Sequence, residues 1–353
     1  MNALTLPLAV LPAGLLALSL MALPAAGAVR YVKPDAPGTN AGTSWTNAYR
    51  DLRAALTAAV AGDQIWIAAG IYYADYNAAT NTRTGDRSLR FPLKSQISVL
   101  GGFAGTETAA AQRDWRANRT ILNGEARSTS IRQDNTMTIM GSFGALNGIV
   151  IDGLVFANGY ADDPRELGGG DLIGGNGGAL YISGEATVRH CVFVNNYATY
   201  GGAIKVYNHA TRLQVEQCLF AFNQARYVGG AIDFHAWQQP LSLTHCTLTG
   251  NSAQRGSGIG VNGGPVTYRG NVFYTDTAET TSGTSVLENN LWPMSTEEGT
   301  GNVTSFAWPF TRSPSAGPDG LWGTMDDELE APLRADSPAV NLCLLYTSDA
   351  ADE

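Results

Sequence analysis

Short stretches of alternating apolar and polar residues recur along the middle of the chain at a nearly constant spacing. Blocks of the type Gly-Gly-Ala-Leu or Gly-Gly-Ala-Ile start at Gly177, Gly201 and Gly229, and a variant, Gly-Ser-Gly-Ile, starts at Gly256, so the steps are 24, 28 and 27 residues. This period predicts a solenoid of short strands. One turn is too thin to bury its own apolar face, whereas stacked turns bury a continuous core.

A second block follows inside each step, with alternating apolar positions and, in three of the four copies, an Asn at its end. These second blocks start at Cys191, Cys218, Cys246 and Asn271, and an earlier copy starts at Leu154. Leucine-rich repeats have a similar period, but these units lack the Leu spacing and the helical half of such repeats. A parallel β-helix, with rungs about 4.8 Å apart, therefore fits better.

Stacking of the repeats predicts which side chains point inward. One inward ladder consists of Leu180, Ile204, Ile232 and Ile259. A second consists of Ile182, Val206, Phe234 and Val261.

The composition agrees with a turn-rich all-β protein. Gly accounts for 41 of 353 residues and charged residues for 15%, which disfavours coiled coils, and the 44% hydrophobic content disfavours a disordered chain. The formal charge of −9 disfavours nucleic acid as a partner, because such surfaces use Lys and Arg to neutralise phosphates. Four Cys in so long a chain are too few for a disulfide scaffold.

The paired Gly-Gly-Ala-Ile and Phe-x-x-Asn blocks resemble the repeats of chlamydial polymorphic outer-membrane proteins and of the wider group of exported bacterial right-handed parallel β-helix proteins. The resemblance implies a single-stranded right-handed parallel β-helix, a pectate-lyase-like solenoid, over residues 29–341. Within it, residues 29–70 correspond to the N-terminal cap and first coil, and residues 177–275 to the clearest repeats. The flanking segments that share the resemblance are residues 31–34, 42–52, 62–72, 101–108, 113–122 and 337–340.

Local patterns add detail outside the repeats. Apolar spacing from Trp45 to Val60 predicts a short capping helix with Ser44 or Thr46 as its N-cap. Residues 75–87 and 159–176 read as loops that leave the stack. After Phe273 the repeat fades into a polar stretch.

Both ends of the chain carry segments that we separate from the solenoid. Residues 1–28 contain an apolar run that ends in small residues, which predicts a signal peptide cleaved before Val29, although the basic segment that usually precedes such a run is missing. A retained membrane anchor is the alternative. No other segment is apolar enough to span a membrane. Residues 344–353 resemble read-through of a sequencing adapter, so we expect 342–353 to be non-native.

The Cys and Asn positions of the repeats have structural interpretations beside functional ones. Cys191, Cys218 and Cys246 occupy one repeat position, and Leu154 occupies it on the earlier rung, which predicts a buried core ladder. A disulfide between neighbouring rungs is the alternative. The Asn side chains, which we expect to stack along the axis or to hold the turn in the left-handed conformation, are Asn196, Asn223 and Asn251.

Outward positions beside the inward ladders hold the candidate chemistry. The ligand-binding candidates are Tyr181, Lys205, Tyr207, Asp233, His235 and Trp237. Aromatic faces of this kind stack on pyranose rings, and Lys205 would pair with a uronate carboxylate. For lyase chemistry the base candidates are Lys205, Tyr207 and His235, with Asp233 beside them. The structural alternative is that Lys205 and Asp233 form an exposed ion pair between rungs, worth under about 1 kcal/mol.

A Gly-rich loop near the C-terminus is the second candidate site. Asp319, Asp326 and Asp327 would supply hard oxygen ligands to calcium, although their spacing does not match an EF-hand. Ordinary turn chemistry explains the Asp-Gly pairs equally well. We therefore expect no cofactor, with calcium as the alternative.

These observations predict a secreted or cell-surface β-helix protein, monomeric, that presents a rigid face for adhesion or for binding an extracellular glycan or another surface ligand. The alternative is a polysaccharide-active enzyme, a uronate lyase or epimerase, that works in a groove on the side of the solenoid. A surface component with a purely structural role is the third interpretation.

Overall fold

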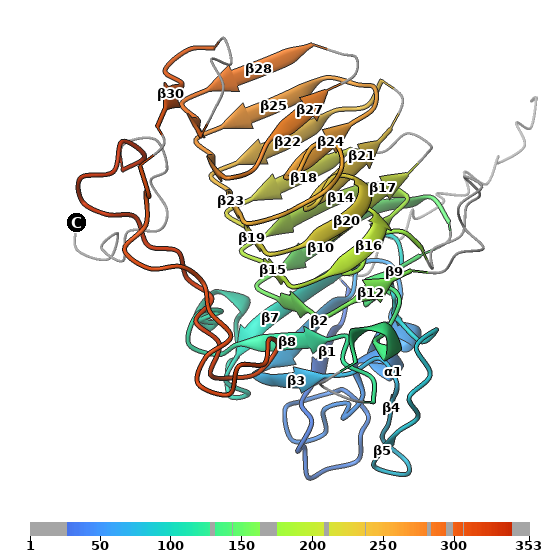
Figure 1. The fold of residues 1–353 in the computed structure, drawn as a ribbon. Helices are drawn as coiled ribbons and strands as arrows, with labels where there is room; N and C mark the ends of the chain where they lie inside the picture. The colour runs from blue at the N-terminus through green and yellow to red at the C-terminus, as the bar shows by residue number, and fades with distance from the viewer. Residues whose placement is uncertain are drawn as a thin grey trace, which may run out of the picture.

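The protein is a stack of short parallel strands wound into a β-helix, as expected from the repeats (Figure 1). The computed structural model describes residues 27–127, 131–142, 144–162, 175–207, 212–236, 238–280, 284–293, 299–305 and 307–340. Each full rung passes through four sheets, which we call D, A, B and E in chain order, and every strand pair within them is parallel.

The strands of each sheet are as follows. Sheet A contains β1 (Val29–Val32), β2 (Gln64–Ala68), β7 (Ser98–Phe103), β10 (Leu146–Asp152), β14 (Gly184–Arg189), β18 (Leu213–Glu216), β22 (Leu241–Thr244), β25 (Val266–Arg269) and β28 (Ser285–Glu288). Sheet B contains β3 (Gly70–Tyr72), β8 (Thr120–Asn123), β11 (Val155–Ala157), β15 (Val192–Val194), β19 (Leu219–Ala221), β23 (Thr247–Thr249), β26 (Val272–Tyr274), β29 (Leu291–Trp292) and β30 (Val303–Thr304). Sheet D contains β6 (Phe91–Pro92), β9 (Met140–Gly141), β13 (Leu180–Ile182), β17 (Ile204–Tyr207), β21 (Ile232–His235), β24 (Ile259–Val261) and β27 (Ala278–Thr280). Sheet E contains β12 (Tyr160–Ala161), β16 (Tyr197–Tyr200) and β20 (Gln224–Val228).

The inward ladders have the predicted register. Leu180 pairs with Ile204, Ile204 with Ile232, and Ile232 with Ile259, and the second ladder pairs in the same way. The side chains of both ladders are buried in the continuous core. The alternation of apolar residues was therefore enough to orient these strands correctly.

Two consecutive glycines serve different purposes at the corner between sheets E and D. The first, as in Gly201 with φ +64°, adopts the left-handed conformation that favours glycine. The second, Gly202, has no positive φ, but a Cβ on it would lie 2.1 Å from the carbonyl oxygen of Gly230. The second glycine is therefore required by the close approach of adjacent rungs.

The Asn ladder forms at the corner between sheets B and E. Asn196 Nδ2 donates to Asn223 Oδ1 at 2.9 Å, and Asn223 Nδ2 donates to Asn251 Oδ1 at 2.9 Å. The left-handed residue at this corner is the preceding one, for example Asn195 with φ 54° or Phe222 with φ 55°. Of the two roles expected for these Asn side chains, the structure has the first: they connect the rungs by hydrogen bonds along the axis, while the left-handed conformation belongs to the residue before each of them.

The Cys ladder is also confirmed. Cys191, Cys218 and Cys246 are fully buried free thiols, with no disulfide among them. Each Sγ faces a backbone carbonyl of the preceding rung, as in the 3.6 Å contact from Cys246 to Val215 O. Burial raises the pKa of the Cys218 thiol well above its ordinary value, which keeps it protonated as a donor.

The stack of rungs continues beyond Phe273, where the repeat fades from the sequence. Asn271 occupies the position of the Cys ladder, and its Nδ2 donates to Asn290 Oδ1 at 3.0 Å, while Asn290 Nδ2 donates to Asn302 Oδ1 at 3.2 Å. These two steps span only 19 and 12 residues. The rungs shorten, so the sequence period is lost although the stacking continues.

The outer face of sheet B is apolar and covered. Residues 307–340, red in Figure 1, run back beside the solenoid, and Phe310, Leu329, Ala331 and Ala339 pack on that face. Asn123 Nδ2 donates to Gly323 O at 3.1 Å, which fastens this return segment to an N-terminal rung.

The N-terminal cap differs from its prediction. Helix α1 (Leu52–Ala58) is shorter than expected, and its N-cap is Asp51, whose carboxylate accepts a hydrogen bond from Arg53 N at 2.8 Å. Ser44 Oγ instead accepts from Asn47 N in the preceding turn. Leu52, Ala55 and Leu56 on α1 are buried in the core, so the helix covers the first rungs as predicted. None of the helices in the described ranges is long and apolar enough to cross a membrane.

The two expected loops are partly structured. Residues 75–87 contain an antiparallel hairpin, β4 (Tyr76–Asn77) and β5 (Thr82–Arg83). Residues 159–176 contribute β12 to sheet E, and residues 163–174 lie outside the described part. Two short 3₁₀ helices, η1 (Ala110–Gln112) and η2 (Arg132–Asp134), lie in other connections. The expected leader up to residue 26 and the expected tail from residue 342 also lie outside the described residues.

Candidate functional site

The predicted outward residues of sheet D come together in two adjacent columns. Tyr181 pairs with Lys205 and Lys205 with Asp233 across β13, β17 and β21, and Tyr207 pairs with His235 in the next column. The register follows from the buried ladders on the other side of the same strands. Trp237 lies outside the described residues.

The ion pair between Lys205 and Asp233 is present, but the expectation that it is exposed is wrong. Both residues are only 4% exposed, and Tyr181 is 3% exposed. Lys205 Nζ lies 5.3 Å from the ring centroid of Tyr200 and 5.6 Å from that of Tyr207, so aromatic rings on two sheets flank the ammonium group.

Burial changes the energetic role of this pair. An exposed pair contributes little, whereas removal of one partner from a buried pair leaves an uncompensated charge at a cost of about 3–5 kcal/mol. Lys205 and Asp233 form an ion pair that is buried under the neighbouring aromatic rings, and these rings pack on it.

Four half-buried rings surround the buried pair, and we call them the aromatic face: Tyr200, Tyr207, Tyr227 and His235. The ring centroids of Tyr200 and Tyr227 are 5.3 Å apart, and those of Tyr207 and His235 are 5.5 Å apart with an edge-to-face geometry. The face thus extends over two rungs at the corner where sheet E meets sheet D. Sequence reasoning found Tyr207 and His235 but missed Tyr200 and Tyr227, which lie on the sheet that precedes the Gly-Gly corner.

The pKa of His235 is lowered from its ordinary value, first because the ring is partly desolvated and then because the Lys205 cation is close, while Asp233 opposes the shift. At neutral pH the imidazole is therefore neutral. A neutral imidazole both accepts and donates hydrogen bonds.

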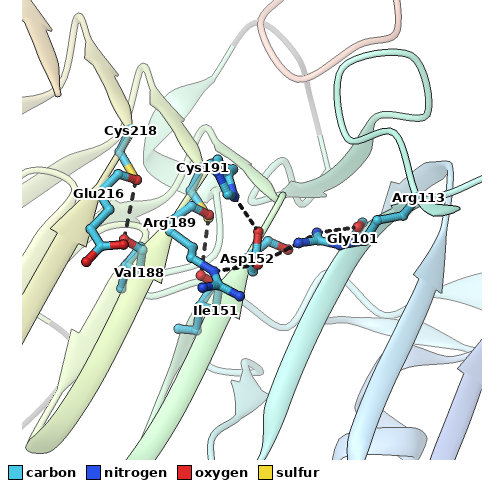
Figure 2. A network of polar contacts seen from close by, with 10 residues as sticks. Gly101, Arg113, Ile151, Asp152, Val188, Arg189, Cys191, Glu216 and Cys218 are labelled. Atoms are coloured by element: carbon cyan, nitrogen blue, oxygen red, sulfur yellow. Dashed lines mark hydrogen bonds and ion pairs between the residues drawn. The ribbon is translucent and has the colours of Figure 1, made fainter. Parts of the chain in front are cut away.

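A second polar cluster lies at the corner between sheets A and B and was not expected from the sequence (Figure 2). Asp152 at the end of β10 is fully buried and contacts Arg113 at 2.5 Å, Arg189 at 2.7 Å and His190 Nδ1 at 2.9 Å. Hydrogen bonds from these groups, His190 first, outweigh desolvation and hold the pKa of the Asp152 carboxyl well below its usual range. Trp115 stacks on His190 with centroids 5.2 Å apart.

This cluster ties three separate parts of the chain to one carboxylate. Figure 2 shows Asp152 between Arg113, which belongs to a connection, and Arg189, which occupies the same register on the next rung. The alignment of the repeats places Asp152 opposite Arg189 on the next rung. It does not predict the contact with Arg113, because Arg113 lies in a connection outside the repeats. The arrangement fastens the residue 113–119 turn against the solenoid.

The predicted calcium residues lie in the return segment. Asp319 Oδ1 accepts from Leu321 N at 2.7 Å, and Asp327 Oδ2 accepts from Gly323 N at 2.7 Å, as in ordinary turns. The other Asp327 oxygen is buried with no hydrogen-bond partner, and burial raises the pKa of this carboxyl to about 6. Within the described ranges no group of three or more His, Cys, Asp or Glu residues is arranged to hold a metal ion.

Comparison of the chain with protein-family models gave no match, and a search of curated proteins also gave none. The fold and the geometry of the aromatic face therefore carry the functional argument.

Proposed function

We propose that this protein is a secreted or cell-surface β-helix protein whose aromatic face binds an extracellular glycan. The observation that carries the proposal is the set of four half-buried rings, which form two contacting pairs on two neighbouring rungs beside a buried ion pair. The motif resemblance to the repeats of polymorphic outer-membrane proteins and the leader-like residues 1–28 support a role outside the cell.

The physical fit is between flat rings and sugar rings. Pyranoses present faces of C–H groups that pack on aromatic side chains, and their hydroxyls need hydrogen-bond partners at the edge. The neutral imidazole of His235 and the phenol groups of Tyr200 and Tyr227 supply both kinds of contact. Because the backbone beneath them is a sheet, the rings need little ordering on binding, which lowers the entropic cost.

A glycan array tests the proposal. We expect specific hits, and replacement of one ring, Tyr227→Ala, should weaken them about tenfold, as for the loss of about 1.4 kcal/mol. Phe222→Ala is the matched control, because Phe222 is exposed at 37% and lies on the corner between sheets B and E, outside the aromatic face. An array without hits, or hits that survive Tyr207→Ala and Tyr227→Ala, contradicts glycan binding by this face.

The neutral state of His235 also favours a second candidate function, a uronate polysaccharide lyase. In that reaction an imidazole takes the proton from the carbon next to the carboxylate, the carbon–oxygen bond at the neighbouring carbon breaks with its electrons going to the leaving oxygen, and a carbon–carbon double bond forms. Lys205 is a poor base here because its ammonium is held by Asp233.

The two candidates are separated by incubation with uronate polysaccharides. A lyase generates unsaturated ends that absorb in the ultraviolet, and His235→Ala should abolish them. His245→Ala is the control, because burial also lowers the pKa of His245, which lies on another corner of the solenoid. No absorbance with any polysaccharide removes the lyase candidate and leaves the binding proposal standing.

A further inference from the structure

A cavity of about 390 Å³ lies at the N-terminal end of the solenoid, between helix α1 and the β4–β5 hairpin, whose places are labelled in Figure 1. This volume falls in the range of about 300–1,000 Å³ that is typical of small-molecule sites. Leu52, Ile71 and Pro34 give it an apolar floor, and three tyrosines line it. Neither the repeats nor the aromatic face contributes to it.

The hairpin brings the aromatic and polar side chains of this cavity together. Tyr76 on β4 donates a hydrogen bond from its hydroxyl to Asn81 Oδ1 at 3.0 Å. The Arg83 guanidinium lies 3.7 Å from the ring centroid of Tyr73 and is held by Asp75, a fully buried carboxylate, at 3.0 Å. Both contacts exist in the protein alone, so these groups are in position before any ligand arrives.

The opposite wall is equally well ordered. Arg50 donates to Ala36 O at 2.8 Å and to Gly38 O at 3.2 Å, and the Asp51 carboxylate caps helix α1. Among the charged residues that line the cavity, Arg83 is paired with Asp75 and Asp35 with Lys33 at 3.7 Å, which leaves Arg50 and Asp51 as one charge of each sign. A balanced lining does not select a charged ligand.

We propose that this cavity binds one neutral sugar residue, a pyranose unit. Tyrosine rings offer faces for the C–H groups of the ring, while carboxylate, carboxamide and guanidinium groups form directed hydrogen bonds with neighbouring hydroxyls. Preorganised side chains lower the entropic cost of binding a ligand that has many hydroxyls. The proposal adds a site to the function proposed above and uses none of the residues of the aromatic face, so either one can fail without the other.

Saturation-transfer NMR and isothermal titration calorimetry with glucose, galactose, mannose, N-acetylglucosamine and glucuronate test the proposal on the full chain. We expect at least one neutral sugar to bind, and Tyr76→Ala to raise its Kd about tenfold. Asn81→Ala, which removes the partner of the Tyr76 hydroxyl on an exposed hairpin, is the second variant. Circular dichroism checks that each variant keeps its fold.

Phe222→Ala is the matched control, because it removes an exposed ring that belongs neither to the cavity nor to the aromatic face, and it should leave the affinity for the monosaccharide unchanged. The proposal is overturned if no neutral sugar binds, if glucuronate binds in preference to them, or if both hairpin variants bind the sugar with the affinity of the wild type. A drop caused by Tyr227→Ala alone would place the binding on the aromatic face and also overturn it.

Discussion

The Asn ladder ends on a carboxyl group, and this end gives the sharpest test of the structure. Asn251 N donates to Asp276 Oδ1 at 3.0 Å, so Asp276 occupies the next position of the ladder. Asp276 is fully buried, and its other oxygen has no hydrogen-bond partner. We predict that Asp276→Asn stabilises the protein.

The ladder itself shows which interaction is missing. Asn223 Nδ2 donates to Phe193 O at 2.9 Å and Asn251 Nδ2 donates to Phe220 O at 2.9 Å, each to the strand of sheet B on the preceding rung. One rung further on, the corresponding acceptor is the carbonyl of Leu248, which pairs in register with Phe220. The ionised carboxyl cannot donate this hydrogen bond and leaves a buried oxygen unsatisfied at a cost of about 1–3 kcal/mol, whereas an amide at position 276 donates it at every pH, a gain of about 0.5–1.5 kcal/mol.

The pH dependence follows from the sign of the shift. Burial raises the pKa of Asp276 well above its ordinary value of 3.8, so the folded protein prefers the neutral acid. The stability that comes from this preference is fully present below the unfolded pKa and is lost as the pH rises through the folded pKa, at about 1.4 kcal/mol per pH unit between the two. Asp276→Asn removes this slope.

Urea unfolding followed by circular dichroism, repeated between about pH 4 and about pH 8, measures both effects. We expect the variant to exceed the wild type by at least about 1 kcal/mol near neutral pH, with a smaller gain in acid. Asn223→Asp is the reverse control, because it places a carboxyl where the amide is fully used, and it should destabilise. A variant no more stable than the wild type at neutral pH, or one with an unchanged slope, refutes this account of the ladder.

Three further predictions use the same unfolding measurement. Lys205→Met should lower the free energy of unfolding by about 3–5 kcal/mol. The double variant Lys205→Met/Asp233→Leu should recover most of this loss, because neither charge is then left buried without its partner. A double variant as unstable as Lys205→Met would contradict a buried ion pair. Gly202→Ala places a Cβ 2.1 Å from a carbonyl oxygen of the next rung and should lower the free energy of unfolding by about 1–3 kcal/mol or more. Gly144→Ala, whose Cβ meets nothing within 4 Å, should not lower it. Equal losses in the two variants would contradict the close stacking of rungs. The lowered pKa of Asp152 stabilises the fold above its ordinary pKa of 3.8, and this stabilisation is lost as the pH falls through the folded pKa. Asp152→Asn should therefore lower the free energy of unfolding at neutral pH and reduce its further fall in acid. If stability falls in acid as steeply as in the wild type, the cluster does not act through this carboxylate.

The sequence predicted most of the fold but only part of the site. The inward ladders and the Cys and Asn columns were readable because each recurs at one position of every repeat. The cluster around Asp152 was missed because Arg113 comes from a connection, where no period applies. The hairpin cavity was missed for the same reason, since Tyr76 and Arg83 belong to a segment that looks like a plain loop.

Recurrence at a fixed position was enough to identify a parallel solenoid and the direction of each side chain, because the two-residue period of a strand decides inside and outside by itself. That period cannot say what covers an outward side chain. Lys205 points outward, as the alternation requires, yet it is buried because Tyr200, on another sheet of the same solenoid, lies beside it. Asn290 and Asn302 extend the column of the Cys ladder although the sequence spacing has shortened, because stacking depends on the corner residue and tolerates connections of different lengths between corners. The direction of a side chain is thus a local property of the strand, while its burial and partners belong to the assembled coil.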